Sequence, residues 1–188
     1  MFVLYWGVRI RSKIVWFSNS LRFKGIYMSQ QYTNKFTPEI KAKLETPPFT
    51  SEEISAMDER ARAIIAKGCE LDRKHPVIAI WRIATEGRIT RRGGIVAPVE
   101  REGKLLLDDG RYASIAIVGD IITYRDGSIA TIASSAGVIS MFKGIGVALV
   151  GSVIDNGDEI INTPQGHTYL VTREGTAPGA DFLTVTGA

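Results

Sequence analysis

The side chains best suited to metal chemistry in this sequence are two histidines and one cysteine. His75, His167 and Cys69 are the only residues of their kinds, and a tetrahedral zinc site would need these distant positions to converge. Because a lone histidine near a strand more often packs or faces solvent than binds metal, we expect His167 to be structural. We interpret the proximity of Cys69 and His75 in the chain as incidental, and we predict no metal centre.

A second group of reactive side chains lies in an acidic turn that contains Asp155, Asp158 and Glu159. Such a turn can bind calcium weakly, but acidic residues also favour turns for local reasons. The sequence has no Gly-x-Ser-x-Gly nucleophile elbow and no phosphate-binding glycine loop. We therefore expect a protein without catalysis of its own. A small metal-binding enzyme domain that uses His75, His167 and this turn is the weakest alternative.

The composition favours one compact domain with an extension. The chain has 188 residues, of which 45% are hydrophobic and 23% are charged, which is enough for a core and argues against disorder. Its 19 glycines against 7 prolines suit a fold with many tight turns. A single cysteine excludes an internal disulfide, so synthesis in the cytoplasm fits the sequence.

Basic charge is concentrated in residues 1–27, which also hold seven of the sixteen aromatic residues. This segment has five basic and no acidic side chains, so from Met28 onward 18 basic and 20 acidic residues leave a net charge of −2. No basic surface for nucleic acid is therefore expected. Three interpretations of the segment stay open: a signal peptide, which its interrupted apolar runs disfavour, an amphipathic surface anchor, and, as the preferred one, a natural start at Met28.

Residues 28–76 have a helical pattern and are expected to form an extension. Thr37, followed by proline, predicts the start of a short helix, and Thr50 and Glu53 have the spacing of a capping box that would open a second. The second helix is expected to run to Gly68. Its predicted apolar stripe consists of Ile54, Met57, Ala61, Ile64 and Ile65. We expect this helix to pack on the domain that follows, with recruitment of another protein as the alternative.

One pattern occurs three times at intervals of 32 residues. In residues 83–89, 115–121 and 147–153, an aliphatic residue and an alanine lead into a glycine, which an aliphatic residue follows two places later. The glycines are Gly87, Gly119 and Gly151. A glycine inside a strand marks a bend or a close backbone approach, so these three predict equivalent bends. A repeat of this length indicates a pseudo-symmetric β-structure.

Each copy of the pattern is followed by a turn signal. The three signals are Gly93-Gly94, Asp126-Gly127 and Asn156-Gly157. These dipeptides supply the positive φ angles that hairpin turns require. Each unit is therefore predicted as strand, bend, strand and turn, which makes residues 77–166 a mainly β domain. Residues 167–188 are expected to add one or two short strands as a C-terminal tail.

These repeats resemble the PAAR-repeat domain over residues 83–163. The resemblance rests on Glu86-Gly87-Arg88-Ile89-Thr90-Arg91-Arg92-Gly93-Gly94, on Ala116-Ile117-Val118-Gly119-Asp120, and on Val147-Ala148-Leu149-Val150-Gly151. It implies a small cone of β-hairpins with threefold pseudo-symmetry. In that family the cone caps a trimeric spike of the valine-glycine-repeat type and sharpens the needle of a type VI secretion system.

The resemblance also implies where the protein works and what it meets. It would be made in the cytoplasm and secreted through the needle, with transient contact to a target membrane. Effectors or adaptors would bind through residues 28–76. A phage-like baseplate spike cap or an adhesin is the alternative, because it shares the β-repeats and differs in its partner.

The resemblance places the spike at the base of the cone, where strand edges would continue the sheets of the spike. The aliphatic residues expected at this base are Ile115, Ile117, Val147 and Leu149. The residues expected at the tip, where hydrogen bonds and ion pairs would hold it, are Arg92, Arg125 and Asp126.

Members of this family commonly bind zinc at the tip through histidine and cysteine placed just before the turn of a repeat. The corresponding positions of this sequence hold Arg91-Arg92, Tyr124-Arg125 and Asp155-Asn156. None of these is a good set of zinc ligands. No metal or other cofactor is therefore expected.

We predict that a chain starting at Met28 is as soluble and as stably folded as the whole chain, because residues 1–27 differ in composition from the rest. Circular dichroism and thermal unfolding of the two proteins measure this. Loss of folding on deletion would show that residues 1–27 belong to the core.

Overall fold

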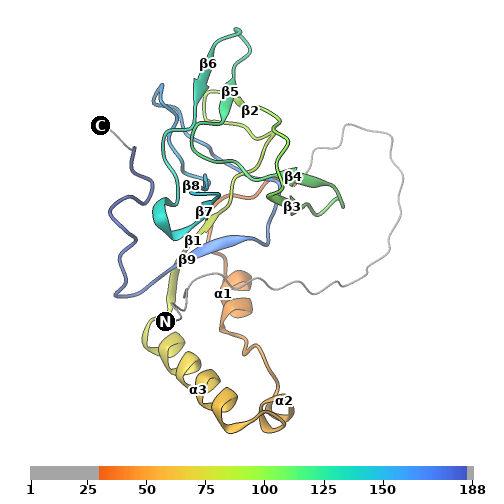
Figure 1. Cartoon of the computed structure of the whole chain (residues 1–188), viewed down its shortest axis with the longest axis vertical. Helices are drawn as coiled ribbons and strands as arrows, with labels where there is room; N and C mark the ends of the chain where they lie inside the picture. Colours follow the sequence, from red (N-terminus) through yellow and green to blue (C-terminus); the bar gives the residue numbers. More distant parts are fainter. Residues whose placement is uncertain (1–29, 186–188) are drawn as a thin grey trace.

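The computed structural model describes residues 30–185, so the prediction for residues 1–27 lies outside the described residues. Within that range, helices come first and short strands follow (Figure 1). The helices are α1 (Pro38–Glu45), α2 (Ser51–Ser55) and α3 (Glu59–Lys74), with a 3-10 turn η1 (Gly137–Ile139) later in the chain. The strands are β1 (Val77–Arg82), β2 (Ile95–Val96), β3 (Lys104–Leu106), β4 (Tyr112–Ser114), β5 (Ile121–Thr123), β6 (Ile129–Thr131), β7 (Met141–Phe142), β8 (Ile145–Gly146) and β9 (Tyr169–Arg173). The predicted mainly β fold with preceding helices is confirmed.

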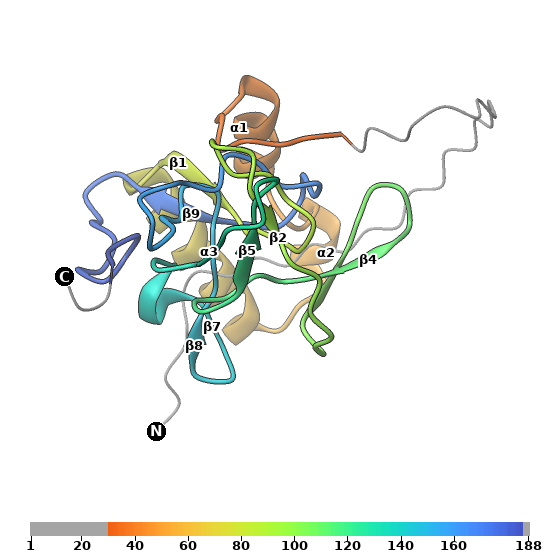
Figure 2. The same cartoon turned by 90° about the horizontal axis from the view of Figure 1, so that it is seen from above.

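The strands pair into small antiparallel sheets. One sheet has the order β2-β5-β6, and the pairs β1–β9, β3–β4 and β7–β8 form three two-stranded ribbons. Seen from above, β1 and β9, β4, and β7 and β8 lie on three sides of β2 and β5 (Figure 2). One strand of each ribbon leads into a copy of the repeat, and these strands end at Arg82, Ser114 and Gly146. The three strand ends are therefore 32 residues apart, like the repeats themselves.

The helices begin at side-chain caps, as expected, but one helix divides in two. Thr37 caps α1, and Thr50 forms a capping box with Glu53 at the start of α2. The predicted single helix from Thr50 to Gly68 is wrong. Asp58 accepts a hydrogen bond from the backbone N–H of Ala61 and starts α3 afresh, because a cap residue satisfies the free amides of a new first turn.

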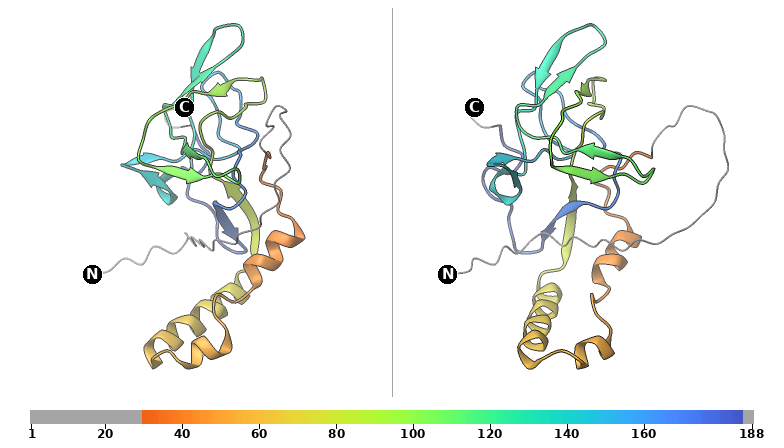
Figure 3. Two further views of the ribbon diagram at one scale, coloured as in Figure 1. Left: turned by 90° about the vertical axis from the view of Figure 1, so that its right-hand side faces the viewer. Right: turned by 45° about the vertical axis from the view of Figure 1, so that its right-hand side comes forward.

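The three helices form an arm that projects from the β-domain (Figure 3). None of their residues is buried, and Ile64 of α3 is 65% exposed. The expected packing of the second helix on the β-domain is therefore not found. The arm is tied at the end of α3, where the guanidinium of Arg173 in β9 lies 2.8 Å from Asp72 and donates to the carbonyl of His75 at 3.0 Å. In residues 30–185, no helix has the length and apolar character needed to cross a membrane.

Backbone hydrogen bonds join the three repeats in a closed ring. Ala84 N–H donates to the carbonyl of Ala148 at 2.9 Å, Ala116 N–H donates to Ala84 at 2.9 Å, and Ala148 N–H donates to Ala116 at 2.8 Å. All three alanines are buried. Bridges beside them pair the neighbouring residues Ile83 with Leu149, Thr85 with Ile115, and Ile117 with Val147.

The repeat glycines bend the chain just after this ring. Gly87, Gly119 and Gly151 have φ angles of 72°, 86° and 99°. A Cβ atom built on Gly87 or Gly119 would have nothing within 4 Å. Glycine is therefore required at these two positions for its backbone angles and not for a close approach of another chain segment.

Each hairpin turns through a glycine in the left-handed region. Gly93, Gly127 and Gly157 have φ angles of 83°, 83° and 80°, and each N–H bonds to the carbonyl three residues earlier. This is the geometry of a three-residue loop closed by a glycine bulge. Gly94 has another role, because a Cβ there would lie 2.6 Å from side-chain atoms of Ile122 and Tyr124.

Two apolar clusters form the core. The main cluster combines the three ring alanines with six apolar residues of the three hairpins; its members are Ala84, Val96, Ala116, Ile122, Ala130, Ile132, Ala148, Ile154 and Ile160. The second gathers around buried Leu149 and Leu170, against which Trp81 and Phe182 pack. The rings of Trp81 and Phe182 meet edge to face at 5.2 Å. The C-terminal segment is thus built into the β-domain.

We predict that valine at Gly87, Gly119 or Gly151 lowers the free energy of unfolding by similar amounts, about 1–3 kcal/mol each, because a β-branched residue is strained at positive φ. Urea unfolding of the three variants measures this. Gly68→Ala in α3 is the control, since nothing lies within 4 Å of its Cβ and alanine favours a helix. One repeat glycine that tolerates valine would show that the bends are not equivalent.

Candidate functional site: the apex and base of the β-domain

The turns of the three repeat hairpins, residues 90–94, 124–128 and 154–158, define the apex of the β-domain. At the apex, Asp158 is only 2% exposed. It accepts hydrogen bonds from the Arg92 N–H at 3.1 and 3.3 Å and from the Tyr124 hydroxyl at 2.8 Å. One buried carboxylate of the third hairpin is therefore bonded to each of the other two.

Further hydrogen bonds extend this cluster. The side-chain amide of Asn156 donates to the Tyr124 hydroxyl at 3.0 Å, while its carbonyl oxygen Oδ1 accepts from the Asp158 N–H at 3.0 Å. The guanidinium of Arg92 donates to the backbone carbonyl of Asn156 at 3.1 Å. Thr90, which is fully buried, also bonds Asp158 through its hydroxyl.

The pKa values of the apex follow from burial and these bonds. Burial raises the pKa of Asp158, but hydrogen bonds from Thr90, the Glu159 N–H, Tyr124 and the Arg92 N–H outweigh burial and leave this pKa below its ordinary value of 3.8. Burial raises the pKa of Tyr124, and its hydrogen bond to Asp158 raises it further. At neutral pH the apex therefore holds an ionised carboxylate and a protonated phenol.

The residues expected at the tip have different surroundings. Arg92 belongs to the apex cluster. The Asp126 carboxylate bonds only within its own turn, to the N–H and hydroxyl of Ser128 at 3.0 and 2.6 Å. Arg125 is exposed. Thr90, Tyr124 and Asp158 were not predicted from the sequence to lie at the tip. The signal for them was that each is a polar residue at the start or end of a predicted hairpin turn.

The three carboxylates of the acidic turn do not converge on one point. Asp155 accepts from the Thr131 hydroxyl at 2.7 Å, and Glu159 pairs with Arg91 at 2.9 Å, while Asp158 faces the apex. Residues 30–185 contain no cluster of three or more His, Cys, Asp or Glu that could hold a metal ion. The hydroxyl, amide and single carboxylate of the apex do not fit zinc, which prefers nitrogen and sulfur ligands in a set of four.

The residues expected at the base divide into two pairs. Ile115 and Ile117 are partly exposed. Val147 and Leu149 are 3% and 0% exposed, so the expectation that they meet a partner is corrected: they are core residues. Leu149 is buried because its side chain packs in the second apolar cluster.

Exposed apolar side chains lie instead on the three ribbons. The most exposed is Tyr112 of β4, at 67%, and its cross-strand partner Leu106 in β3 is also exposed. The others on the ribbons are Ile78, Met141 and Ile145. The outer side of the sheet β2-β5-β6 is an uncharged surface, whose exposed residues are Ile95, Ile121, Thr123 and Ile129.

A buried arginine fastens the start of the described chain to strand β1. The guanidinium of Arg82, at the end of β1, lies 5.5 Å from the ring centre of Tyr32 and 5.8 Å from that of Tyr169. It donates to the carbonyl of Thr33, and its backbone N–H donates to the Asn34 side chain at 2.8 Å. Burial and a hydrogen bond to Asp108 raise the pKa of Tyr32 to about 12. Residues 32–34 therefore belong to the β-domain, although they precede the helical arm.

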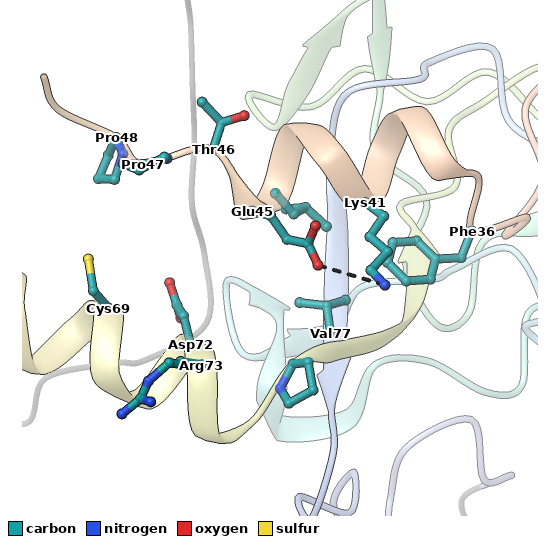
Figure 4. Close-up of a pocket in the computed structure, with 12 residues that line it drawn as sticks. Phe36, Lys41, Glu45, Thr46, Pro47, Pro48, Cys69, Asp72, Arg73 and Val77 are labelled. Carbon is teal, nitrogen blue, oxygen red and sulfur yellow. Dashed lines mark ion pairs between the residues drawn. The ribbon is translucent and has the colours of Figure 1, made fainter.

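A cleft of about 400 Å³ opens between α1 and α3 (Figure 4). Its apolar lining comes from Phe36, Leu44, Pro47, Pro48, Pro76 and Val77. Charged side chains border it, including an ion pair between Lys41 and Glu45 at 3.8 Å, and the exposed thiol of Cys69 also lines it. The cleft lies in the segment expected to bind effectors or adaptors.

Comparisons with protein-family models, curated proteins and solved structures give no match for this chain.

We predict that the stability of the protein falls in acid partly through Asp158. Because the pKa of this carboxyl is lowered by folding, its stabilising contribution is present above the ordinary value of 3.8 and is lost as pH falls through the lower folded value. The free energy of unfolding, measured in urea from about pH 6 to 2, should therefore fall less steeply for Asp158→Asn than for the unchanged protein below about pH 4. Parallel curves would contradict the prediction.

Proposed function

We propose that this chain is a non-catalytic tip protein whose β-domain is a PAAR-like cone with threefold pseudo-symmetry. The observation that carries the proposal is the ring of Ala84, Ala116 and Ala148, in which each repeat donates one backbone hydrogen bond and accepts one. Residues 32 positions apart also occupy equivalent places. The repeat glycines bend the chain, and the last residues of β1, β4 and β8 end the ribbon strands. A fold with this repetition suits a partner with three equal chains.

The partner we propose is the trimeric spike of the valine-glycine-repeat type. The three ribbons supply strand edges, since β3, β7 and β9 each pair with one strand among the described elements. A strand with one unpaired side can accept a strand of another protein through backbone hydrogen bonds. The exposed apolar residues of the ribbons, with Ile115 and Ile117, would add burial to this contact.

The other surfaces suit the remaining parts of this function. The apex, held by its buried hydrogen bonds, would lead the needle, and the uncharged side of β2-β5-β6 would meet the target membrane transiently. Effectors or adaptors would bind the arm, where the cleft between α1 and α3 offers an apolar surface. The protein would be made in the cytoplasm and leave it through the needle.

The same geometry supports one alternative, a phage-like baseplate spike cap or adhesin, which differs only in the protein at the base. Genomic neighbours distinguish the two. The alternative of a metal-binding enzyme has less support, because within residues 30–185 the histidines and the acidic turn form no cluster able to hold metal.

We predict that the protein elutes with a valine-glycine-repeat spike trimer from the same genome at one copy per trimer. Ile145→Asp on the β7–β8 ribbon should weaken this binding at least about tenfold, because it places a charge in an apolar contact. Ile64→Asp on α3 is the matched control, an exposed isoleucine that belongs to the arm and not to a ribbon.

Two outcomes would contradict the proposed partner. One is the absence of a complex with the spike. The other is equal binding by the Ile145→Asp variant and the unchanged protein, which would move the contact away from this ribbon.

A further inference from the structure

The three hairpin turns come together at Asp158, with which no arginine or lysine side chain of residues 30–185 forms an ion pair. The guanidinium of Arg91 pairs with Glu159, and that of Arg92 donates to the Asn156 carbonyl. The negative charge of Asp158 is instead stabilised by N–H and hydroxyl donors. A buried carboxylate that accepts several hydrogen bonds can stay ionised without a paired cation.

The donors to this carboxylate come from all three hairpins. The first hairpin supplies Thr90 and the Arg92 N–H, the second supplies the Tyr124 hydroxyl, and the third supplies the N–H of Glu159 at 2.8 Å. Removing the carboxylate would leave these donors facing one another in a buried space. A buried polar group without a hydrogen-bond partner lowers the stability of the fold, so the bonds to Asp158 hold the three hairpins together.

The lengths of the hairpins explain why the second one contributes a tyrosine. Its turn begins at Tyr124, two residues beyond the position that lies 32 residues after Thr90. A long side chain can reach back across this distance. The ring of Tyr124 lies against Gly94, where a Cβ would approach ring atoms to 2.6 and 2.8 Å, so the glycine leaves room for the ring.

We propose that the carboxylate of Asp158 locks the apex in place of a metal ion, by bonding one hairpin to the other two. The comparison with a zinc-bearing tip rests on the proposed function, but the lock itself does not. The chain would then complete its apex from its own side chains during folding. A metal-free apex of this kind needs no zinc supply and resists chelators.

The test uses the full chain, purified without added metal. We expect well under one zinc per chain by mass spectrometry and the same melting temperature with and without EDTA. In Tyr124→Phe, which keeps the ring against Gly94 and removes one bond, we expect the amide hydrogens of Arg92 and Asp158 to exchange at least about tenfold faster. Asp158→Asn should have a larger effect on these amides.

Two controls make this result specific. Asp126→Asn removes a carboxylate that bonds only within its own turn, so exchange at Arg92 should not change. In a double variant of Tyr124→Phe and Asp158→Asn, the tyrosine change should add little, because its bond partner is already altered. If Asp158→Asn fails to fold, Tyr124→Phe alone carries the test.

Three results would overturn the lock: a stoichiometric zinc that resists dialysis, a melting temperature that falls in EDTA, or unchanged exchange at Arg92 in Tyr124→Phe. Spike binding is measured separately on the same proteins. A protein with the expected exchange that binds no spike would contradict the proposed function and leave the lock standing.

Discussion

The hydrogen bonds between Ala84, Ala116 and Ala148 impose the constraint on which the rest of the β-domain depends. Three chain segments meet at one place, and their backbone N–H and C=O groups are buried there, so each group must find a partner in another segment. A closed ring meets this requirement with one bond for each pair of segments. Side chains larger than a methyl group would compete for the same buried space, which accounts for alanine at all three positions. The chain then has to turn sharply away from the ring, and the glycines with positive φ make that turn.

The backbone repeats itself, but the side chains built on it do not. Thr90 and Tyr124 begin the first two turns, whereas Asp158 ends the third, and these different side chains form one cluster in which the carboxylate accepts from the two hydroxyls. The outer faces also differ, since the sheet β2-β5-β6 exposes isoleucine and threonine, whereas the third hairpin carries Asp155 and Glu159 in polar contacts. Under the proposed function, the repeated part of the structure faces a symmetric partner. The side chains that differ between the repeats form the apex and the outer faces, which would meet the target.

The arm follows another physical rule. Its helices have well-capped starts and exposed polar residues, but none of their residues is buried. Most of the stability of a helix in a protein comes from packing of an apolar face, and the arm has little of it in the isolated chain. Its position is set by the contacts of Arg173 with Asp72 and His75 at the end of α3. This arrangement leaves the apolar lining of the cleft between α1 and α3 open to a partner, which agrees with the role proposed for it.

Local features of this protein were determined by the sequence by itself. The caps at Thr37 and Thr50, the mainly β character after residue 77, the bends at the repeat glycines and the positive φ of the turn glycines depend on a few neighbouring residues, so spacing and residue type predicted them. The tertiary structure alone decided which side chains meet. It buried Leu149 against Trp81 and Phe182, from opposite ends of the domain, and it brought Thr90, Tyr124 and Asp158 together across more than sixty residues. Such contacts depend on how three hairpins of unequal length close around a common ring. No local pattern encodes that geometry, because the side chains of each hairpin find their partners in the other two hairpins.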